Sequence, residues 1–237
     1  MNIRLMPRVE DIVQKNIAKS NAIVIDMLRA TSVITTALYN GARGVIPVLT
    51  VDEAMAAREK CSDVVLGGER RGLKINGFDL GNSPLEYTPS NIKDKTIIMT
   101  TSNGTRAIKG CESANHIYIG SMLNGKSVAA RASLDDADIS IVCAGTLGKF
   151  SLDDFICAGY IIDELMKVKS YVLDDISFAA HYMYDANKKD VEGIIKNASH
   201  YNYLVSIGLE GDIKYCCRMG ILDIVPEYKD GIISNPF

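Results

Sequence analysis

Short apolar runs rich in β-branched residues alternate with segments of helical periodicity along most of this chain. The alternation predicts strands at residues 22–25, 44–49, 64–66, 96–100, 116–119 and 139–142. Helices are expected at residues 29–39, 50–61 and 151–166, with further helix starts at 83–86 and 101–106. Strands and helices that alternate through short connections favour a sheet covered on both faces. We therefore predict a single domain, residues 1–237, with a three-layer α/β/α fold and a largely parallel or mixed central sheet.

Local signals refine this prediction at a few positions. Pro47 has no N–H group to donate, which predicts an edge strand or a bulge at residues 44–49. Thr50 and Glu53 have the spacing of a capping box at a helix start. Apolar spacing predicts mostly helix over 170–209, and a closing pair of strands or an edge within 221–233.

Composition and charge exclude several classes of function. The chain is 47% apolar and 23% charged, as expected of a protein that can bury a full core, and its net charge of −3 gives no general attraction to nucleic acid. No apolar stretch approaches the roughly 18 residues of a membrane helix, and Met1 is not followed by the apolar core of a signal peptide. Six cysteines without CxxC spacing indicate reduced thiols. We expect a cytoplasmic protein with a small-molecule partner, which could form a homo-oligomer.

Four polar or glycine-rich segments fall at the predicted ends of strands. They are residues 26–32, 67–83, 100–106 and 143–154. In α/β sheets, ligands bind at the carboxyl ends of strands, so segments far apart in sequence should meet along one edge. We expect these four segments to form one cleft.

The first segment begins with Asp26, which closes a wholly apolar strand. An ionised carboxylate is costly there unless it is paired or bound to a metal. Arg29, Thr31 and Ser32 follow at a helix start, where free N–H groups and hydroxyls favour an anion. The alternative, that Asp26 is a helix cap with Arg29 as its ion-pair partner, is equally compatible with the sequence.

The second segment is a long loop with five glycines among its charged residues. A simple surface turn needs one or two glycines, and loops of this length inside a domain are usually functional or disordered. Each arginine alone is better explained as a solvated surface charge, but the loop as a whole favours function. Its candidate metal ligands are Glu69 and Asp79, and its candidate anion or substrate ligands are Arg70, Arg71, Asn82 and Ser83.

The third segment places hydroxyls, an amide and a guanidinium at a strand-to-helix turn. Such groups at a helix N-terminus form an oxyanion cradle, and this interpretation is favoured over an Asn-Gly turn before an ordinary capped helix. The candidates are Thr100, Thr101, Asn103, Gly104, Thr105 and Arg106.

The fourth segment offers Gly145 and a pair of aspartates in the first turn of a helix. Capping explains at least one of Asp153 and Asp154, because negative charge is favourable there. The other could reach a metal, and Asp154 is the candidate. Cys143 is better explained as a small buried apolar residue than as a nucleophile.

Together the segments supply carboxylates and fixed cations, which suit Mg²⁺ and a small phosphorylated acid. The sequence contains no P-loop, and Lys149 stands where a Cys-x5-Arg phosphatase would need arginine. His116, His181 and His200 lie outside all four segments. We therefore expect structural or surface roles for the histidines and no histidine nucleophile.

At these residues the chain resembles the 2-phosphosulfolactate phosphatase family. The similar motifs are residues 24–32, 67–70 with 77–84, 100–106, and 143–145 with 151–154. They follow the family's order and span 24–159, with a weaker match to Pro226. Ser102 stands where a third threonine is common, and Asp153 where glutamate is expected.

The resemblance implies a Mg²⁺-dependent hydrolase that converts 2-phospho-3-sulfolactate to sulfolactate and phosphate, a step of coenzyme M synthesis in methanogens. The expected catalytic residues are Asp26, Arg29, Glu69, Arg70 and Arg106, with Asp26 as nucleophile or metal ligand. The alternatives are a phosphatase of another small sulfonic or carboxylic acid, a metal-dependent lyase or phosphotransferase, and a non-catalytic binder of such a metabolite.

Overall fold

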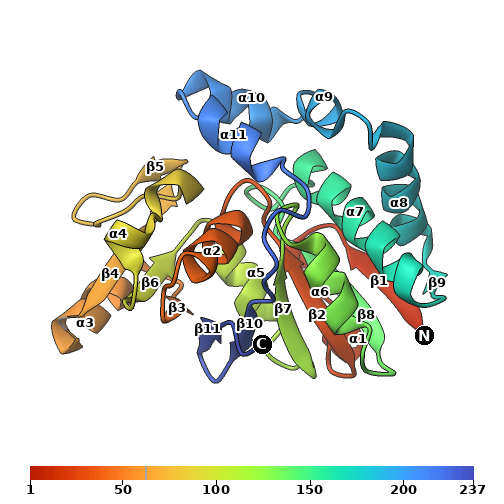
Figure 1. Ribbon diagram of the computed structural model, residues 1–237, viewed down its shortest axis with the longest axis horizontal. Coiled ribbons are helices and arrows are strands. Elements are labelled where there is room, and N and C mark those ends of the chain that lie inside the picture. Colours follow the sequence, from red (N-terminus) through yellow and green to blue (C-terminus); the bar gives the residue numbers. More distant parts are fainter. Residues whose placement is uncertain (62) are drawn as a thin grey trace.

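The computed structural model describes residues 1–61 and 63–237, and the strands of these ranges form one mixed, mostly parallel sheet of eleven (Figure 1). The order across the sheet is β5-β4-β6-β3-β11-β10-β7-β2-β8-β1-β9. The strands are β1 Asn2–Met6, β2 Ser20–Ile25, β3 Gly44–Pro47, β4 Val64–Arg70, β5 Leu73–Lys74, β6 Thr96–Thr100, β7 His116–Gly120, β8 Asp138–Cys143, β9 Val172–Leu173, β10 Glu227–Lys229 and β11 Ile232–Ser234.

Helices pack on both faces of this sheet (Figure 1). Ile23 and Ile25 of β2 point into a core shared with α6 and α7, whereas Ala22 and Val24 point into a core shared with α2 and α5. This alternation is the period-two pattern of a strand buried on both sides. The helices are α1 Gln14–Ile17, α2 Ala30–Tyr39, α3 Val51–Lys60, α4 Pro89–Ile92, α5 Gly104–Gly110, α6 Gly125–Ala132, α7 Leu152–Val168, α8 Asp175–Asn187, α9 Val191–Ile195, α10 Ser199–Ser206 and α11 Glu210–Cys216, with 3₁₀ turns η1 Val9–Asp11 and η2 Pro84–Glu86.

The sheet contains two groups of parallel strands, separated by the β10–β11 hairpin. Strands β4, β6 and β3 form one group, and β7, β2, β8 and β1 form the other. The hairpin joins them through single residue pairs, Glu227 with Tyr118 and Ile233 with Val45. Helices α2 and α5 cross between the groups, because α2 connects β2 to β3 and α5 connects β6 to β7. Their N-terminal ends therefore bring residues from both groups together.

The predicted α/β fold is confirmed, and a strand is present within each of the six predicted ranges. The Thr50 cap is also confirmed, since its side chain accepts a hydrogen bond from the Glu53 amide at 3.1 Å. The edge or bulge prediction for Pro47 is wrong, because β3 lies between β6 and β11. Proline is tolerated in β3 because β11 pairs with this strand only at Val45, so the missing N–H group of Pro47 breaks no hydrogen bond on that side. On the other side, the Val48 amide donates a hydrogen bond to β6 and so continues the pairing beyond Pro47.

Strand β1 and the short strands β5 and β9 were not predicted from the pattern. In β1, Asn2 and Arg4 interrupt the apolar run, and both bind the carboxylate of Asp138 at the start of β8. The pairing with β8 is thus supported by polar contacts that no local pattern indicates. In the described part of the chain, no helix combines the length and apolar character needed to cross a bilayer.

Candidate active site

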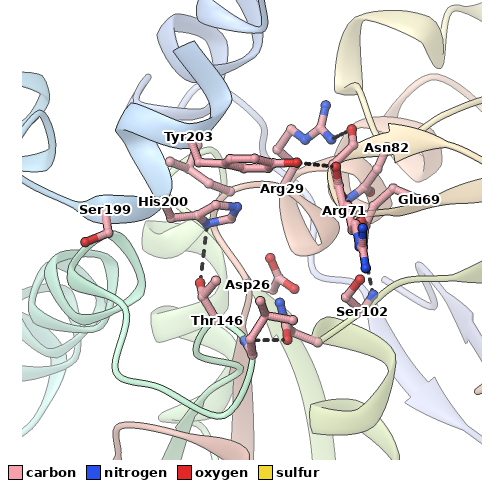
Figure 2. Close-up of a pocket in the computed structure, with 14 residues that line it drawn as sticks. Asp26, Arg29, Glu69, Arg71, Asn82, Ser102, Thr146, Ser199, His200 and Tyr203 are labelled. Atoms are coloured by element: carbon pink, nitrogen blue, oxygen red, sulfur yellow. Dashed lines mark hydrogen bonds between the residues drawn. The ribbon is translucent and has the colours of Figure 1, made fainter. Parts of the chain in front are cut away.

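The segments from the strand ends meet around a cavity of about 400 Å³, which α10 covers on one side (Figure 2). The cavity lies where the ends of β2, β4, β6 and β8 approach one another. Its lining residues are Asp26, Leu28, Arg29, Glu69, Arg71, Gly72, Asn82, Ser102, Asn103, Thr146, Leu147, Ser199, His200 and Tyr203.

Asp26 lies directly after β2 and is 7% exposed. Its carboxylate accepts a hydrogen bond from the Ala30 amide in the first turn of α2, at 3.3 Å. Burial raises the pKa of Asp26 to about 6, and the charges of Glu69 and Asp153 add to the rise, although His200 and the Ala30 hydrogen bond oppose it. A carboxyl group with a raised pKa inside a cavity is typical of a functional site.

Gly104 begins α5 immediately beside this carboxylate. A Cβ atom added at Gly104 would lie 2.8 Å from Oδ2 of Asp26 and 2.7 Å from the Ala30 Cβ. A side chain there would displace Asp26 or separate the two crossover helices. The glycine therefore permits the close approach of α2 and α5 at the cavity.

Arg29 lines the cavity, but its guanidinium also forms a buried ion pair with Asp212 of α11 at 2.6 Å. It donates a second hydrogen bond to the Gly72 carbonyl oxygen at 2.6 Å. The other oxygen of Asp212 accepts from the Ser83 hydroxyl at 2.6 Å. Arg29 thus links the start of α2, the loop after β4 and α11.

Glu69, at the end of β4, connects the second and third segments. One carboxylate oxygen accepts from the Gly72 amide and the other from the Ser102 amide, each at 2.7 Å. The side chain therefore positions the 67–83 loop against the end of β6. Each oxygen keeps a further lone pair for a ligand in the cavity.

Several predicted site residues are not among those that line the cavity, including Arg106, Asp79 and Arg70. Arg106 pairs with Glu10 at 3.1 Å, and Asp79 pairs with Arg58. Arg70 donates to the Thr100 hydroxyl at 3.0 Å. The neighbouring Arg71 lines the cavity instead, and its carbonyl oxygen accepts from the Tyr203 hydroxyl at 2.7 Å (Figure 2).

Most of the predicted hydroxyls bind the backbone of their own segments. Thr31 accepts from the Asp26 amide, Ser32 donates to the Met27 carbonyl oxygen, and Thr105 donates to the Thr101 carbonyl oxygen. The Thr101 hydroxyl in turn accepts from the Thr105 amide. These contacts stabilise the helix starts that surround the cavity.

Asp154 of α7 joins the first and fourth segments. Its two oxygens accept from the Met27 amide at 2.8 Å and the Gly145 amide at 3.0 Å. Burial and the charges of Asp153 and Asp26 raise its pKa well above the usual range. Asp154 and Gly145 thus hold the loop around Asp26, and neither is among the lining residues.

Helix α10 contributes Ser199, His200 and Tyr203 to the cavity, and none of them was predicted from the sequence. A structural or surface role was expected for His200, and the structure places its side chain among those that line the cavity. Asp212 was also missed. His200 lies in α10 and Asp212 in α11, and each of these helices is preceded by another helix rather than by a strand. An argument based on the ends of strands therefore gave no signal for either residue.

Oxygen ligands for a hard cation are present in the cavity. Asp26 and Glu69 supply carboxylates, and Oδ1 of Asn82 is buried without a hydrogen-bond partner in the described residues. The described ranges contain no cluster of three or more histidine, cysteine or acidic side chains arranged for a metal. Mg²⁺ typically uses one or two carboxylates plus substrate oxygens and water, so this donor set fits it.

The fold and the cavity define an α/β protein with a buried carboxyl group in a pocket at the ends of its parallel strands. The family model described as 2-phosphosulpholactate phosphatase matches residues 6–231. The chain belongs to this 2-phosphosulfolactate phosphatase family of phosphoric monoester hydrolases.

Curated relatives match over nearly their full length. The chain is 52% identical over 235 residues to a probable 2-phosphosulfolactate phosphatase of Clostridium acetobutylicum, covering 98% of this chain and 100% of the relative. Proteins of the same description from Clostridium novyi and Clostridium beijerinckii are 51% and 47% identical. These matches cover 96% and 99% of this chain and 97% and 99% of the two relatives.

Proposed function

We propose that this protein uses Mg²⁺ to hydrolyse the phosphate ester of 2-phospho-3-sulfolactate, releasing sulfolactate and inorganic phosphate. The observation that carries the proposal is the position of Asp26, a buried carboxyl group in a cavity that also contains Arg29 and Arg71. Family membership supplies the substrate. The role of this step in coenzyme M synthesis belongs to the proposal and rests on the family resemblance.

Positive groups in the cavity support binding of a polyanionic substrate. Arg71 and His200 lie among the lining residues, and Arg29 extends from the N-terminal end of α2. The backbone dipoles at that end of the helix also favour an anion. Arg29 is partly neutralised by Asp212, so we assign the larger share of new charge contacts to Arg71 and His200.

Mg²⁺ would be held by Asp26 and Glu69, with the Asn82 side-chain oxygen as a further donor. When bound, the cation neutralises charge on the phosphate oxygens, which is the main requirement of phosphoryl transfer. Asp79 and Asp154 are less suited to this role, since neither is among the residues that line the cavity and Asp79 is paired with Arg58.

Asp26 acts in its ionised form in either version of the chemistry. It attacks phosphorus directly, or it takes the proton of an attacking water. Hydrolysis in ¹⁸O-labelled water under single-turnover conditions separates the two. A phosphorylated aspartate that can be trapped supports direct attack. Label entering phosphate at once, with no enzyme-bound phosphate at any time, contradicts it.

Phosphate release from a panel of phosphorylated acids tests the function itself. The wild-type protein should release phosphate from 2-phospho-3-sulfolactate with Mg²⁺ and lose this activity in a chelator. Release from phosphorylated carboxylic acids alone would point to the alternative substrate class. Binding of the ester without turnover would point to a binder.

A further inference from the structure

His200 has a position in the cavity that fits a role beyond attracting the negative charge of a substrate. Its side chain is 17% exposed, and its ring extends from the first turn of α10 toward the space in front of Asp26 (Figure 2). Nδ1 lies 3.6 Å from an oxygen of Asp153 and 3.5 Å from the Thr146 hydroxyl. No described residue forms a hydrogen bond with Nε2, which points into the cavity in Figure 2.

Asp153 is itself held in place. Its side chain is 1% exposed, and its other oxygen accepts a hydrogen bond from the Ser151 hydroxyl. The Ser151 and Thr146 hydroxyls lie 3.1 Å apart, so Ser151 links the two residues, Thr146 and Asp153, that lie near Nδ1 of the ring. A buried carboxylate behind one imidazole nitrogen fixes the orientation of the ring and favours its protonated form.

We propose that His200 is a catalytic residue that protonates the ester oxygen when the P–O bond breaks, and that Asp153 is its positioning residue. This inference rests on the proposed phosphatase function. The leaving group would be the alkoxide of a hydroxy acid, which departs poorly without a proton. A positioned general acid typically contributes about 10²- to 10⁴-fold to such a step.

The charges around the ring are consistent with this role. Burial works to lower the pKa of His200, and Arg29 adds to that effect. The carboxylates of Asp153 and Asp26 outweigh both and raise the pKa above its usual value. Asp153 comes from α7, Asp26 from the end of β2 and Arg29 from the start of α2, and the charged side chains of Glu69 and Arg71 line the same cavity. The Asp153 and Asp26 carboxylates therefore favour the imidazolium form of His200.

Each proton and electron pair in this step has a defined source and destination. The electron pair of the broken P–O bond stays on the ester oxygen, which takes the proton from Nε2. The new P–O bond uses an electron pair from water or from Asp26. If Asp26 attacks, neutral His200 takes a proton from the water that later cleaves the acyl phosphate. If water attacks, its proton goes to Asp26 and His200 is reprotonated from solvent.

Two substrates that differ in their leaving group test the proposal. His200→Gln should lower kcat for 2-phospho-3-sulfolactate about 100-fold or more. The same change should lower kcat for 4-nitrophenyl phosphate less than fivefold, because a nitrophenolate leaves without protonation. His181→Gln is the matched control, since His181 contacts Asp163 on α7 and does not line the cavity. It should leave both rates unchanged.

A pH profile gives an independent readout. His200→Gln should remove the alkaline limb of kcat for the sulfolactate ester, and Asp153→Asn should move that limb to lower pH without changing KM. Equal losses on both substrates, or an alkaline limb that persists in His200→Gln, would overturn the assignment. If His200→Gln does not fold, the Asp153→Asn profile decides the question. A wild-type protein that releases no phosphate from the sulfolactate ester would instead refute the proposed function.

Discussion

The guanidinium of Arg29 and the carboxylate of Asp212 lie 2.6 Å apart, and both side chains are almost fully buried. Arg29 is in the first strand-end segment, whereas Asp212 is 183 residues later in α11. The pair therefore ties the C-terminal helices to the start of α2, at the cavity. This contact explains how a helix remote in sequence contributes to the site.

Asp212→Asn should destabilise the protein strongly, because it leaves the Arg29 charge buried without its partner. Loss of one member of a buried pair typically costs about 3–5 kcal/mol. Urea denaturation should show a lower free energy of unfolding by about this amount. Glu210→Gln, an exposed change on the same helix, is the control and should have little effect. Equal stabilities of the two variants would contradict the structural role of the pair.

The raised pKa of Asp26 predicts that its charge destabilises the metal-free protein. The pKa is about 6 in the folded state against 3.8 for the ordinary group, so this contribution to stability is fully present below pH 4 and is lost as pH rises to about 6. Asp26→Asn should therefore be more stable than the wild type at pH 7 in a chelator, by up to about 3 kcal/mol.

The comparison should be made by urea denaturation at pH 4 and pH 7. At pH 4 the advantage of Asp26→Asn should largely disappear, because the wild-type carboxyl group is then mostly protonated. A variant that is less stable than the wild type at both pH values would show that the Asp26 charge is well compensated in the folded protein. The same variant should have no measurable phosphatase activity.

Much of the fold was predictable because it depends on local patterns. The strands around Ile23, Ile97 and Ile141 are apolar runs that any sheet buried on both faces requires. Strand β1 could not be predicted, since its pairing depends on the polar contacts of Asn2 and Arg4 with Asp138.

The site was predictable to the extent that it follows from strand ends. Asp26 and Glu69 were expected to meet in one cleft, and both line the cavity. The choice between Arg70 and Arg71 depends on the turn after β4, where Arg71 has a positive φ of 51°. His200 reaches the cavity through the packing of α10, which no strand-end rule indicates.

Arg71→Ala should weaken binding of phosphate esters more than Arg106→Ala. Arg71 lines the cavity, whereas Arg106 pairs with Glu10 and is half exposed. Loss of a charged contact to the substrate is worth about 1.5 kcal/mol, so KM should rise about tenfold for Arg71→Ala. KM for Arg106→Ala should stay close to the wild-type value. A larger rise in KM for Arg106→Ala than for Arg71→Ala would support the sequence-based prediction that Arg106 binds the substrate.

Gly104→Ala should impair catalysis, because the added methyl group would collide with Asp26 and Ala30. Overpacking of this kind typically costs about 1–3 kcal/mol of stability, and displacement of Asp26 should lower kcat as well. Gly211→Ala is the matched control. Its added Cβ would make an ordinary contact of 3.6 Å with Leu85, and alanine favours the helical conformation of α11. Full activity of Gly104→Ala would mean that the close approach at Asp26 is not required.

The central claim is that Asp26 and a divalent cation act together on a phosphate ester in this cavity. Phosphate release from 2-phospho-3-sulfolactate, measured for the wild type with Mg²⁺, the wild type in chelator and Asp26→Asn with Mg²⁺, tests it most directly. We predict release in the first case and none above background in the other two. Equal release in all three, or no release by the wild type with Mg²⁺, would contradict the account.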